Sequence, residues 1–290
     1  MGSKLRTILI TGSTDGIGRH AAMELAKNPQ NHVIIHGRSQ QRCQQAIDYI
    51  QQELGSQARN STLDCAIGDL SDLNQVVSLA ADVRNRFPKL NVLICNAGVL
   101  SPQRQTTKQG LELTFQVNHL SHFLLVECLR DLLTRNAPSR IAIVSSMVHD
   151  WCKELIWADL QAERPGAYDK YEQYSASKLA NHYFGFALAR RLTPSRVFVN
   201  VLEPGVIQTK LLAAGGFSGT SVAEGAVPLV HLAQDPTVEG VAGKYFNSQA
   251  KIIKPASHSL DEKAQEQLWQ ISVKMCEKAG VWPPKLPPLA

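Results

Sequence analysis

Long apolar runs are missing from this chain of 290 residues. No stretch approaches the roughly 18 consecutive apolar residues that a membrane-spanning helix needs. The first strand-like segment begins at Thr7, so no signal peptide fits before it. We therefore expect a cytoplasmic protein without a membrane anchor.

Paired cysteines are also missing. The cysteines stand singly, with no C-x-x-C spacing, at Cys43, Cys65, Cys95, Cys128, Cys152 and Cys276. Because 44% of the residues are hydrophobic, the chain can bury a core that needs no disulfides. We expect free thiols in a reducing compartment and no metal site.

Dense basic clusters are absent as well, although the formal net charge is +5. The nearest approaches are Lys4 with Arg6 and Arg190 with Arg191, which are too short to form a nucleic-acid surface. Nucleic acid is therefore not an expected partner. The modest positive excess suits an anionic cofactor.

What the chain does contain is an alternation of short apolar segments with helical patterns such as Leu73, Val76, Ala80 and Val83. The apolar segments are Thr7–Ile10, His32–His36, Thr62–Ile67, Val92–Cys95, Arg140–Ser145, Val197–Leu202 and Gly243–Phe246. Nearly continuous apolar strands are typical of sheets that helices cover on both faces. We predict one α/β domain over residues 1–290, a doubly wound parallel sheet of the Rossmann type with about seven strands.

Two later segments depart from this alternation. Gly205–Gly243 is punctuated by Gly215, Gly216 and Pro228, and we expect a helical substrate lid over the carboxyl edge of the sheet. Residues 261–290 are expected to form a closing amphipathic helix, Asp261–Ala279, and a Pro-rich tail.

A glycine-rich turn follows the first predicted strand directly. It consists of Thr11, Gly12, Ser13, Thr14, Asp15, Gly16, Ile17 and Gly18, and a helix continues from Arg19. Glycines allow the tight turn and the close approach of a pyrophosphate, and the helix N-terminus attracts its charge. A plain turn would also use glycine, but this position favours nucleotide binding by residues 12–19.

The end of the second predicted strand lacks the carboxylate that NAD-binding proteins use to bind the ribose 2′-hydroxyl. It reads His36-Gly37-Arg38-Ser39. A guanidinium there can pair with a 2′-phosphate, and Arg19 could add a second cation. The alternative is that Arg38 is only an exposed loop residue. We predict NADP(H) as the cofactor.

The spacing T-G-x-x-x-G-x-G resembles that of the short-chain dehydrogenase/reductase superfamily, in its single-domain form. Further motifs of that family follow in order, at Asp69-Leu70, Asn96-Ala97-Gly98, Asn118, Ser145-Ser146, Tyr174 with Lys178, Pro204-Gly205 and Thr209. Cys95 stands where the family's N-N-A-G motif has its first Asn. Glu112–Leu125, Ser145–His149 and Gly240–Phe246 resemble the retinol-dehydrogenase-like branch, many members of which carry an N-terminal membrane anchor.

The resemblance implies a role for each motif. Asp69 and Leu70 would contact the adenine, and Asn96, Ala97, Gly98, Pro204, Gly205 and Thr209 would border the cofactor. Lys178 would bond the nicotinamide ribose, and Asn118 would hold a water that links Lys178 to solvent. Family members commonly pair through the helices corresponding to Leu111–Leu133 and Tyr171–Leu192, whereas others are monomers, so a homo-oligomer stays open.

The candidate catalytic residues Asn118, Ser146, Tyr174 and Lys178 fit carbonyl chemistry. A phenol with a pKa of about 10 is a poor acid–base group at neutral pH unless its anion is stabilised. Tyr174 and Lys178 are four residues apart and share a helical face, so the ammonium can stabilise the phenolate. Ser146 would polarise the substrate oxygen, with Ser145 as the competing candidate.

We therefore expect an oxidoreductase that moves a hydride between nicotinamide and a carbonyl or alcohol. Apolar side chains in Met147–Tyr171 indicate a bulky apolar substrate, such as an aldehyde, a retinoid- or steroid-like ketone or a quinone; they are Trp151, Leu155, Ile156, Trp157 and Tyr168. His149, close behind Ser146, is expected to line the pocket. The alternatives are an epimerase or dehydratase, whose T-G-x-x-G-x-x-G spacing is missing, and a non-catalytic NADP(H)-binding regulator, which would not need Tyr174, Lys178 and Ser146.

Overall fold

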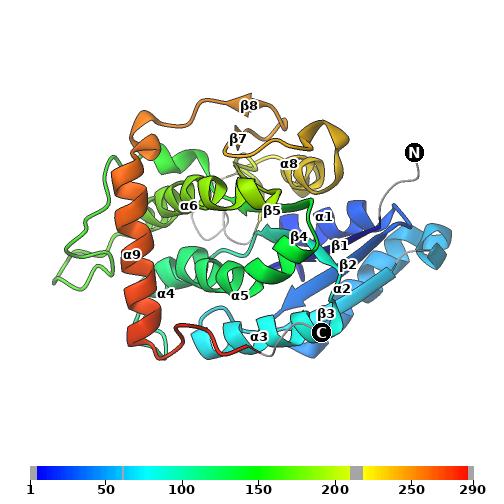
Figure 1. The fold of residues 1–290 in the computed structure, drawn as a ribbon, viewed down its shortest axis with the longest axis horizontal. Coiled ribbons are helices and arrows are strands. Elements are labelled where there is room, and N and C mark those ends of the chain that lie inside the picture. Colours follow the sequence, from blue (N-terminus) through cyan, green and yellow to red (C-terminus); the bar gives the residue numbers. More distant parts are fainter. Residues whose placement is uncertain (1–4, 61, 210–217, 287–290) are drawn as a thin grey trace.

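The computed structural model describes residues 5–60, 62–209 and 218–286 (Figure 1). Its strands are β1 (Arg6–Ile10), β2 (Asn31–Gly37), β3 (Thr62–Ile67), β4 (Leu90–Cys95), β5 (Ser139–Val144), β6 (Val197–Leu202), β7 (Tyr245–Phe246) and β8 (Ile252–Ile253). Its α-helices are α1 (Gly16–Ala26), α2 (Gln40–Leu54), α3 (Leu73–Arg86), α4 (Leu113–Phe115), α5 (Ser121–Arg135), α6 (Lys170–Leu192), α8 (Val222–Gln234) and α9 (Glu262–Lys278). A π-helical turn, η2 (Gln116–Leu120), joins α4 to α5. Short 3₁₀ segments are η1 (Gly55–Asn60), η3 (Met147–Asp150), η4 (Thr193–Ser195), η5 (Pro236–Val238) and η6 (Ser257–Leu260).

The strands form one sheet in the order β3-β2-β1-β4-β5-β6-β7-β8. All neighbouring pairs are parallel except β7 and β8, which are antiparallel. The predicted doubly wound parallel sheet is confirmed, with eight strands among the described residues where the sequence indicated about seven. The additional strand β8 is two exposed residues long, too short to produce a periodic pattern in the sequence.

Successive residues of each central strand face opposite helical layers, as the two-residue period of a strand requires. Ile8 and Ile10 pack with α1, α2 and α8, whereas Leu9 packs with α3, α5 and α6. Figure 1 shows these two layers on either side of the sheet. Burial on both faces explains why the strands read as continuous apolar segments in the sequence.

The predicted lid, Gly205–Gly243, lies partly outside the described residues, because 210–217 are not among them. The helix α8 within this stretch packs against α1, and Ala226, Leu229 and Leu232 are buried in the core of that layer. This part of the stretch is therefore an integral helix of the fold. A lid role for the rest of it stays a prediction.

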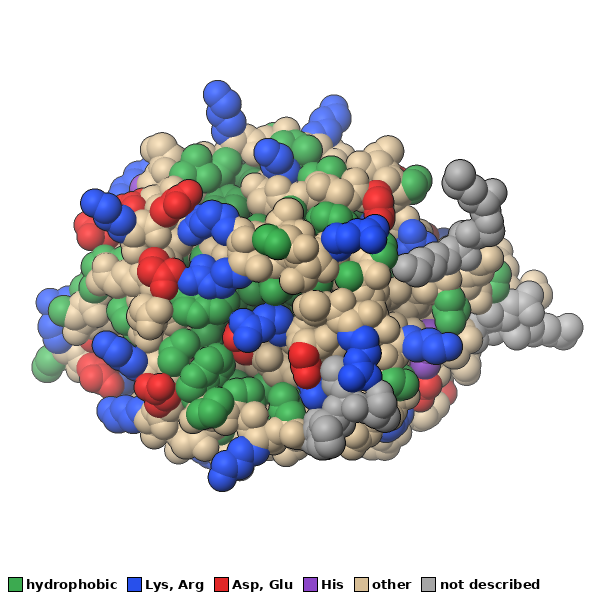
Figure 2. Space-filling view, viewed as in Figure 1, with side chains coloured by type: hydrophobic (Ala, Val, Ile, Leu, Met, Phe, Trp, Pro, Cys, Tyr) green, Lys and Arg blue, Asp and Glu red, His purple; other side chains and the backbone are tan. Residues whose placement is uncertain are grey.

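The C-terminal helix α9 crosses beside α6 at one end of the molecule (Figure 1). Trp269 of α9 packs against Phe123 of α5 and Phe184 of α6, with ring centroids 5.1 and 6.0 Å apart. The Arg191 guanidinium lies 4.0 Å from the centre of the Trp269 ring. Within the described ranges, no helix combines the length and apolar character that crossing a bilayer requires. On the face drawn in Figure 2, Lys and Arg side chains are interspersed with Asp and Glu.

Candidate active site

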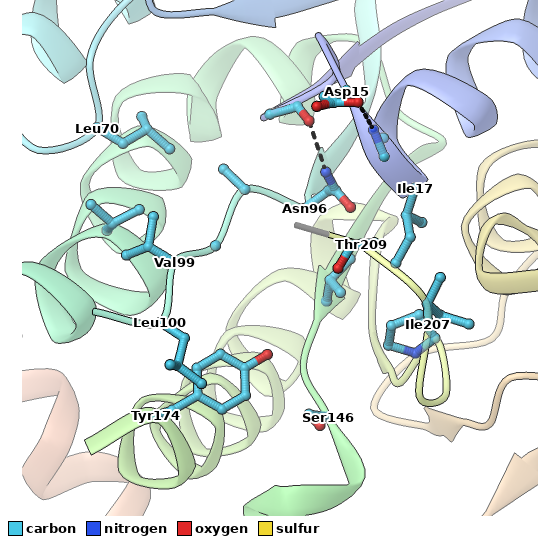
Figure 3. Close-up of a pocket in the computed structure, with 18 of the residues that line it drawn as sticks. Asp15, Ile17, Leu70, Asn96, Val99, Leu100, Ser146, Tyr174, Ile207 and Thr209 are labelled. Carbon is cyan, nitrogen blue, oxygen red and sulfur yellow. Dashed lines mark hydrogen bonds between the residues drawn. The ribbon is translucent and has the colours of Figure 1, made fainter. Parts of the chain in front are cut away.

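A cleft of about 1170 Å³ opens at the carboxyl ends of the central strands, where β1 and β4 lie side by side. Sheets of this kind bind ligands at that place, because the connections on either side of it diverge. The sequence-predicted residues that line the cleft are Gly12, Thr14, Asp15, Gly16, Ile17, Gly18, Arg19, Arg38, Asp69, Leu70, Asn96, Ala97, Gly98, Ser146, Tyr174, Lys178, Pro204, Gly205 and Thr209 (Figure 3). The fold thus brings segments from the whole chain to one site.

Ser13 and Asn118 are fully buried and do not line the cleft. The Ser13 hydroxyl donates to the Ile10 carbonyl at 2.7 Å and accepts the His36 N–H at 2.9 Å. The Asn118 side chain bonds both the N–H and the carbonyl of Val99, at 2.8 and 3.0 Å. Both side chains hold the walls of the cleft in place.

The glycine-rich turn brings the N-terminus of α1 to the cleft. Gly12 has φ +65°, and a Cβ there would lie 2.8 Å from the Ala97 Cα, so only glycine fits. A Cβ on Gly18 would lie 2.6 Å from the Gly12 carbonyl oxygen. Asp15 caps the helix by accepting the Gly16 N–H at 2.8 Å. The close-packed turn and the helix N-terminus together form a cradle that fits a pyrophosphate.

Basic side chains gather at one end of the cleft. Arg19, Arg38 and Arg42 line it together with Tyr49. The Arg19 guanidinium lies 4.0 Å from the centre of the Tyr49 ring and 3.7 Å from the Asp15 carboxylate. Arg38 is exposed and forms no salt bridge with any residue that the structure describes. Sequence reasoning missed Arg42 and Tyr49, although Arg42 lies in the first turn of the helix that follows Arg38.

His36 supports the glycine-rich turn from β2. Its Nδ1 accepts the Gly12 N–H at 3.0 Å, and its Nε2–H donates to the Gly68 carbonyl at 3.1 Å. An amide can only donate and a carbonyl can only accept, so the ring must be neutral. Burial lowers the pKa of His36 to about 4, which keeps it neutral at physiological pH.

His122 makes a similar connection from α5. Its Nδ1–H donates to the Asn118 carbonyl at 3.1 Å, and its Nε2 lies 2.9 Å from the Thr11 hydroxyl oxygen. That oxygen also accepts the N–H groups of Asn96 and Ala97, at 2.8 and 3.0 Å. Burial lowers the pKa of His122 to about 4. The neutral His122 therefore connects the glycine-rich turn at Thr11, the Asn96-Ala97 motif and Asn118.

Tyr174 and Lys178 project from α6 into the cleft, one helical turn apart. The Lys178 ammonium lies 5.3 Å from the centre of the Tyr174 ring and donates to the Val144 carbonyl at 3.2 Å. Burial raises the pKa of Tyr174 and lowers that of Lys178 to about 8. At neutral pH the phenol keeps its proton and the amine is mainly charged, as proton donation to a carbonyl oxygen requires.

Ser146 lies where the chain leaves β5, and Figure 3 shows it facing the same opening as the Tyr174 hydroxyl. Its Oγ accepts the Val148 N–H at 3.3 Å, which leaves the hydroxyl hydrogen available to a substrate oxygen. The neighbouring Ser145 hydroxyl instead donates to the Lys178 carbonyl at 2.9 Å. Of the two serines, Ser146 is the one placed to bond a substrate.

Apolar side chains surround the cleft near Ser146. Met147, Trp151 and Val206 line it and are 52%, 65% and 46% exposed, so they form an open apolar rim. The other expected pocket residues lie elsewhere. Leu155 and Trp157 pack under α6, Ile156 is on the surface, and the Tyr168 hydroxyl donates to the Ser101 carbonyl at 2.8 Å. Those residues hold the loop in place. Fewer aromatic side chains therefore line the cleft than the sequence analysis predicted.

Comparison with known proteins identifies the family. The model of the short chain dehydrogenase family matches residues 6–152, which include the cofactor cradle and Ser146. The chain belongs to the short-chain dehydrogenase family. It is 38% identical to mouse retinol dehydrogenase 14 over 93% of its own length and 85% of that protein. It is 32% identical to human retinol dehydrogenase 13, covering 93% of this chain and 84% of that one. The predicted retinol-dehydrogenase-like branch is confirmed, and membership implies a nicotinamide cofactor.

Solved structures share the fold. An uncharacterized protein from Mycobacterium paratuberculosis aligns with a TM-score of 0.76 at 26% identity, covering 94% of each chain. A short chain dehydrogenase from Shigella flexneri in complex with NADP aligns with a TM-score of 0.66 at 26% identity, covering 85% of this chain and 98% of the other.

Proposed function

We propose that this chain is an NADP(H)-dependent oxidoreductase that interconverts a bulky apolar carbonyl compound and its alcohol. The observation that carries the proposal is the placement of Ser146, Tyr174 and Lys178 in one cleft with the arginines at its other end. Bound nicotinamide would supply or accept the hydride. A non-catalytic cofactor-binding role would not require this set of side chains.

Each of the three side chains has a distinct task in carbonyl reduction. The Tyr174 hydroxyl donates its proton to the substrate oxygen as negative charge develops there. The charged Lys178, 5.3 Å from the phenol ring, stabilises the phenolate that remains. The Ser146 hydroxyl donates a hydrogen bond to the same substrate oxygen. In alcohol oxidation the same groups work in reverse, with Tyr174 as the base.

The cradle fits the dinucleotide, and the arginines favour NADP over NAD. Arg38 and Arg42 can pair with a 2′-phosphate, and Arg19 is held over the Tyr49 ring beside them. The Asp69 carboxylate, which accepts the Ser71 hydroxyl at 2.8 Å, lines the cleft where it can accept an adenine amino group. The similar Shigella structure was solved with NADP.

The cofactor assignment predicts at least about tenfold higher kcat/KM with NADPH than with NADH, since a charge-assisted pair contributes that much to affinity. Arg38→Asp should abolish or invert the preference, because it removes the pair and adds repulsion. Arg38→Lys is the matched control and should keep part of the preference for NADPH. Calorimetric titration of both cofactors into the three proteins measures the difference in affinity on which this preference rests. Equal affinities in the wild type would contradict the assignment.

The substrate class follows from the rim formed by Met147, Trp151 and Val206, which presents apolar surface at the entrance. Relatives of the chain are named retinol dehydrogenases, and retinol is an apolar alcohol of this kind. The test is NADPH oxidation with decanal, all-trans-retinal, a steroid ketone and phenanthrenequinone, against glyceraldehyde as a polar control. Preferred turnover of glyceraldehyde would contradict the apolar class.

A further inference from the structure

His149 lies three residues after Ser146 and, contrary to the sequence-based expectation, does not line the cleft. It belongs to the turn η3, is 4% exposed and is packed against α6. Its ring stacks on that of His182 with centroids 3.7 Å apart and an angle of 14°, and it meets the Tyr245 ring edge-on at 5.3 Å. The ring is therefore held in one orientation.

The hydrogen bonds of His149 assign a specific form of its ring. Nδ1 lies 2.8 Å from the Ser146 carbonyl oxygen, which can only accept, so Nδ1 carries the hydrogen. Nε2 lies 3.2 Å from the Ala256 nitrogen, whose N–H can only donate, so Nε2 is the acceptor. His149 thus joins the backbone of Ser146 to a segment more than a hundred residues later in the chain.

Ser146 needs such a support because the sheet no longer holds it. Ser145 is the last residue bonded to β6, through its N–H to the Leu202 carbonyl at 2.7 Å. Beyond it, the Ser146 carbonyl accepts the backbone N–H and the ring N–H of the same residue, His149, at 3.1 and 2.8 Å. The direction of the Ser146 hydroxyl depends on the backbone that these bonds fix.

We propose that His149 is a positioning residue that fixes Ser146 for hydrogen bonding to the substrate oxygen, through its Nδ1–H bond to the Ser146 carbonyl. The inference rests on the proposed carbonyl chemistry at Ser146. The bond from Ala256, just before η6 and α9, buttresses the ring from the far side. The C-terminal segment therefore supports the catalytic serine without entering the cleft.

Two matched substitutions separate the nitrogens of the ring. The side-chain amide of His149→Asn places an N–H where Nδ1 was, whereas His149→Gln places its amide where Nε2 was. We expect His149→Asn to reduce decanal with a kcat within about threefold of wild type. His149→Gln should lose at least about tenfold, which is less than the roughly hundredfold loss from removing such a donor outright. KM for decanal and the NADPH dissociation constant should change by less than about threefold in both.

Hydrogen–deuterium exchange on the NADPH complexes gives a second readout that needs no turnover. The amides of Val148, His149 and Trp151 are bonded within the turn. They should exchange as slowly in His149→Asn as in wild type, and faster in His149→Gln. A wild type that reduces no probe carbonyl would refute the proposed function, and exchange would still decide the positioning role. If the His149→Gln protein does not fold, slow amide exchange of the turn in His149→Asn supports the proposal.

Three results would overturn the inference. Equal losses of kcat in the Asn and Gln variants would mean that the ring acts only by filling space. Full activity in the Gln variant would mean that the Nδ1–H bond is dispensable. Fast exchange of the turn in the Asn variant would show that an N–H at this position does not hold Ser146.

Discussion

The reactive residues are defined by burial as much as by their identity. The ordinary pKa values of Tyr174 and Lys178 are nearly equal, at 10.0 and 10.5, but burial raises the pKa of Tyr174 and lowers that of Lys178 to about 8, so the two differ more in acidity than in water. Burial thus favours the neutral form of each group, and a phenolate at Tyr174 needs a nearby positive charge to stabilise it. The pair alone is a common chance match in sequences, and its meaning comes from the cleft around it.

Tyr174→Phe should abolish carbonyl reduction, because it removes the proton donor and keeps the ring. NADPH binding should stay within about threefold, since Tyr174 lies on α6 and the glycine-rich cradle is formed by the turn before α1. Turnover and fluorescence titration measure the two effects separately. Near-wild-type turnover in this variant would show that another group supplies the proton.

The lowered pKa of Lys178 predicts the pH profile of reduction. As pH rises through about 8, Lys178 loses its proton and no longer stabilises the Tyr174 phenolate. We expect kcat/KM for decanal at saturating NADPH to be flat near neutral pH and to fall about tenfold per pH unit above 8. Lys178→Arg keeps its charge and should move the fall to higher pH. A flat wild-type profile to pH 10 would contradict the role of Lys178.

His36 and His122 predict how stability depends on acid. Each has a folded-state pKa of about 4 against an ordinary value of 6.5, so the unfolded state binds protons first. Their stabilisation is complete above pH 6.5 and is lost as pH falls toward 4, at about 3 kcal/mol each. Tm should therefore drop between pH 7 and 5, and His122→Asn should reduce the slope. An unchanged wild-type Tm over that range would contradict this.

At the scale of elements, the strands could be predicted because burial on both faces leaves nearly continuous apolar segments. The predicted β3 and β6 match the structure residue for residue, whereas β8 gave no signal. The motif residues could be predicted because their spacing reflects local turns. The roles of His36 and His122 could not, since their hydrogen bonds join segments far apart in the sequence.

The π-helical turn at Gln116–Leu120 was not predictable from periodicity, which indicated one continuous helix. Such turns widen a helix and are frequent at functional sites. Here the turn contains Asn118, whose carbonyl accepts the His122 ring N–H at 3.1 Å. Asn118 thus lies in the π-helical turn, from where its side chain bonds the backbone of Val99 beside the cleft.

At the scale of the whole molecule, α9 packs along α6, which lies in one of the two segments that the family resemblance indicated for pairing. Every residue of α6 from Ser177 to Ala189 is buried within the single chain. Arg191 bonds Glu266 of α9, and Trp269 fills the space between α5 and α6. A second copy could reach this face of α6 only by displacing α9.

The sequence left open whether copies pair through Leu111–Leu133 and Tyr171–Leu192; because α9 occupies this face of α6, we predict a monomer in solution. Light scattering after gel filtration should give a mass near 31.9 kDa. Trp269→Ala, which loosens the packing of α9, should lower Tm and leave the measured mass that of a monomer. A dimer that cross-links through α6 would contradict this arrangement. The cytoplasmic location stays a prediction, to be tested by cell fractionation.

The central claim, NADP(H)-dependent reduction of an apolar carbonyl at Tyr174, has one direct test. NADPH deuterated at its transferable position is incubated with the wild type and decanal, and the product is analysed by mass spectrometry. The account predicts decanol with one deuterium on the former carbonyl carbon, and none with Tyr174→Phe. NADPH that binds tightly while decanal, retinal and quinone all remain unreduced and unlabelled would contradict the claim, and would indicate a cofactor-binding protein without this activity.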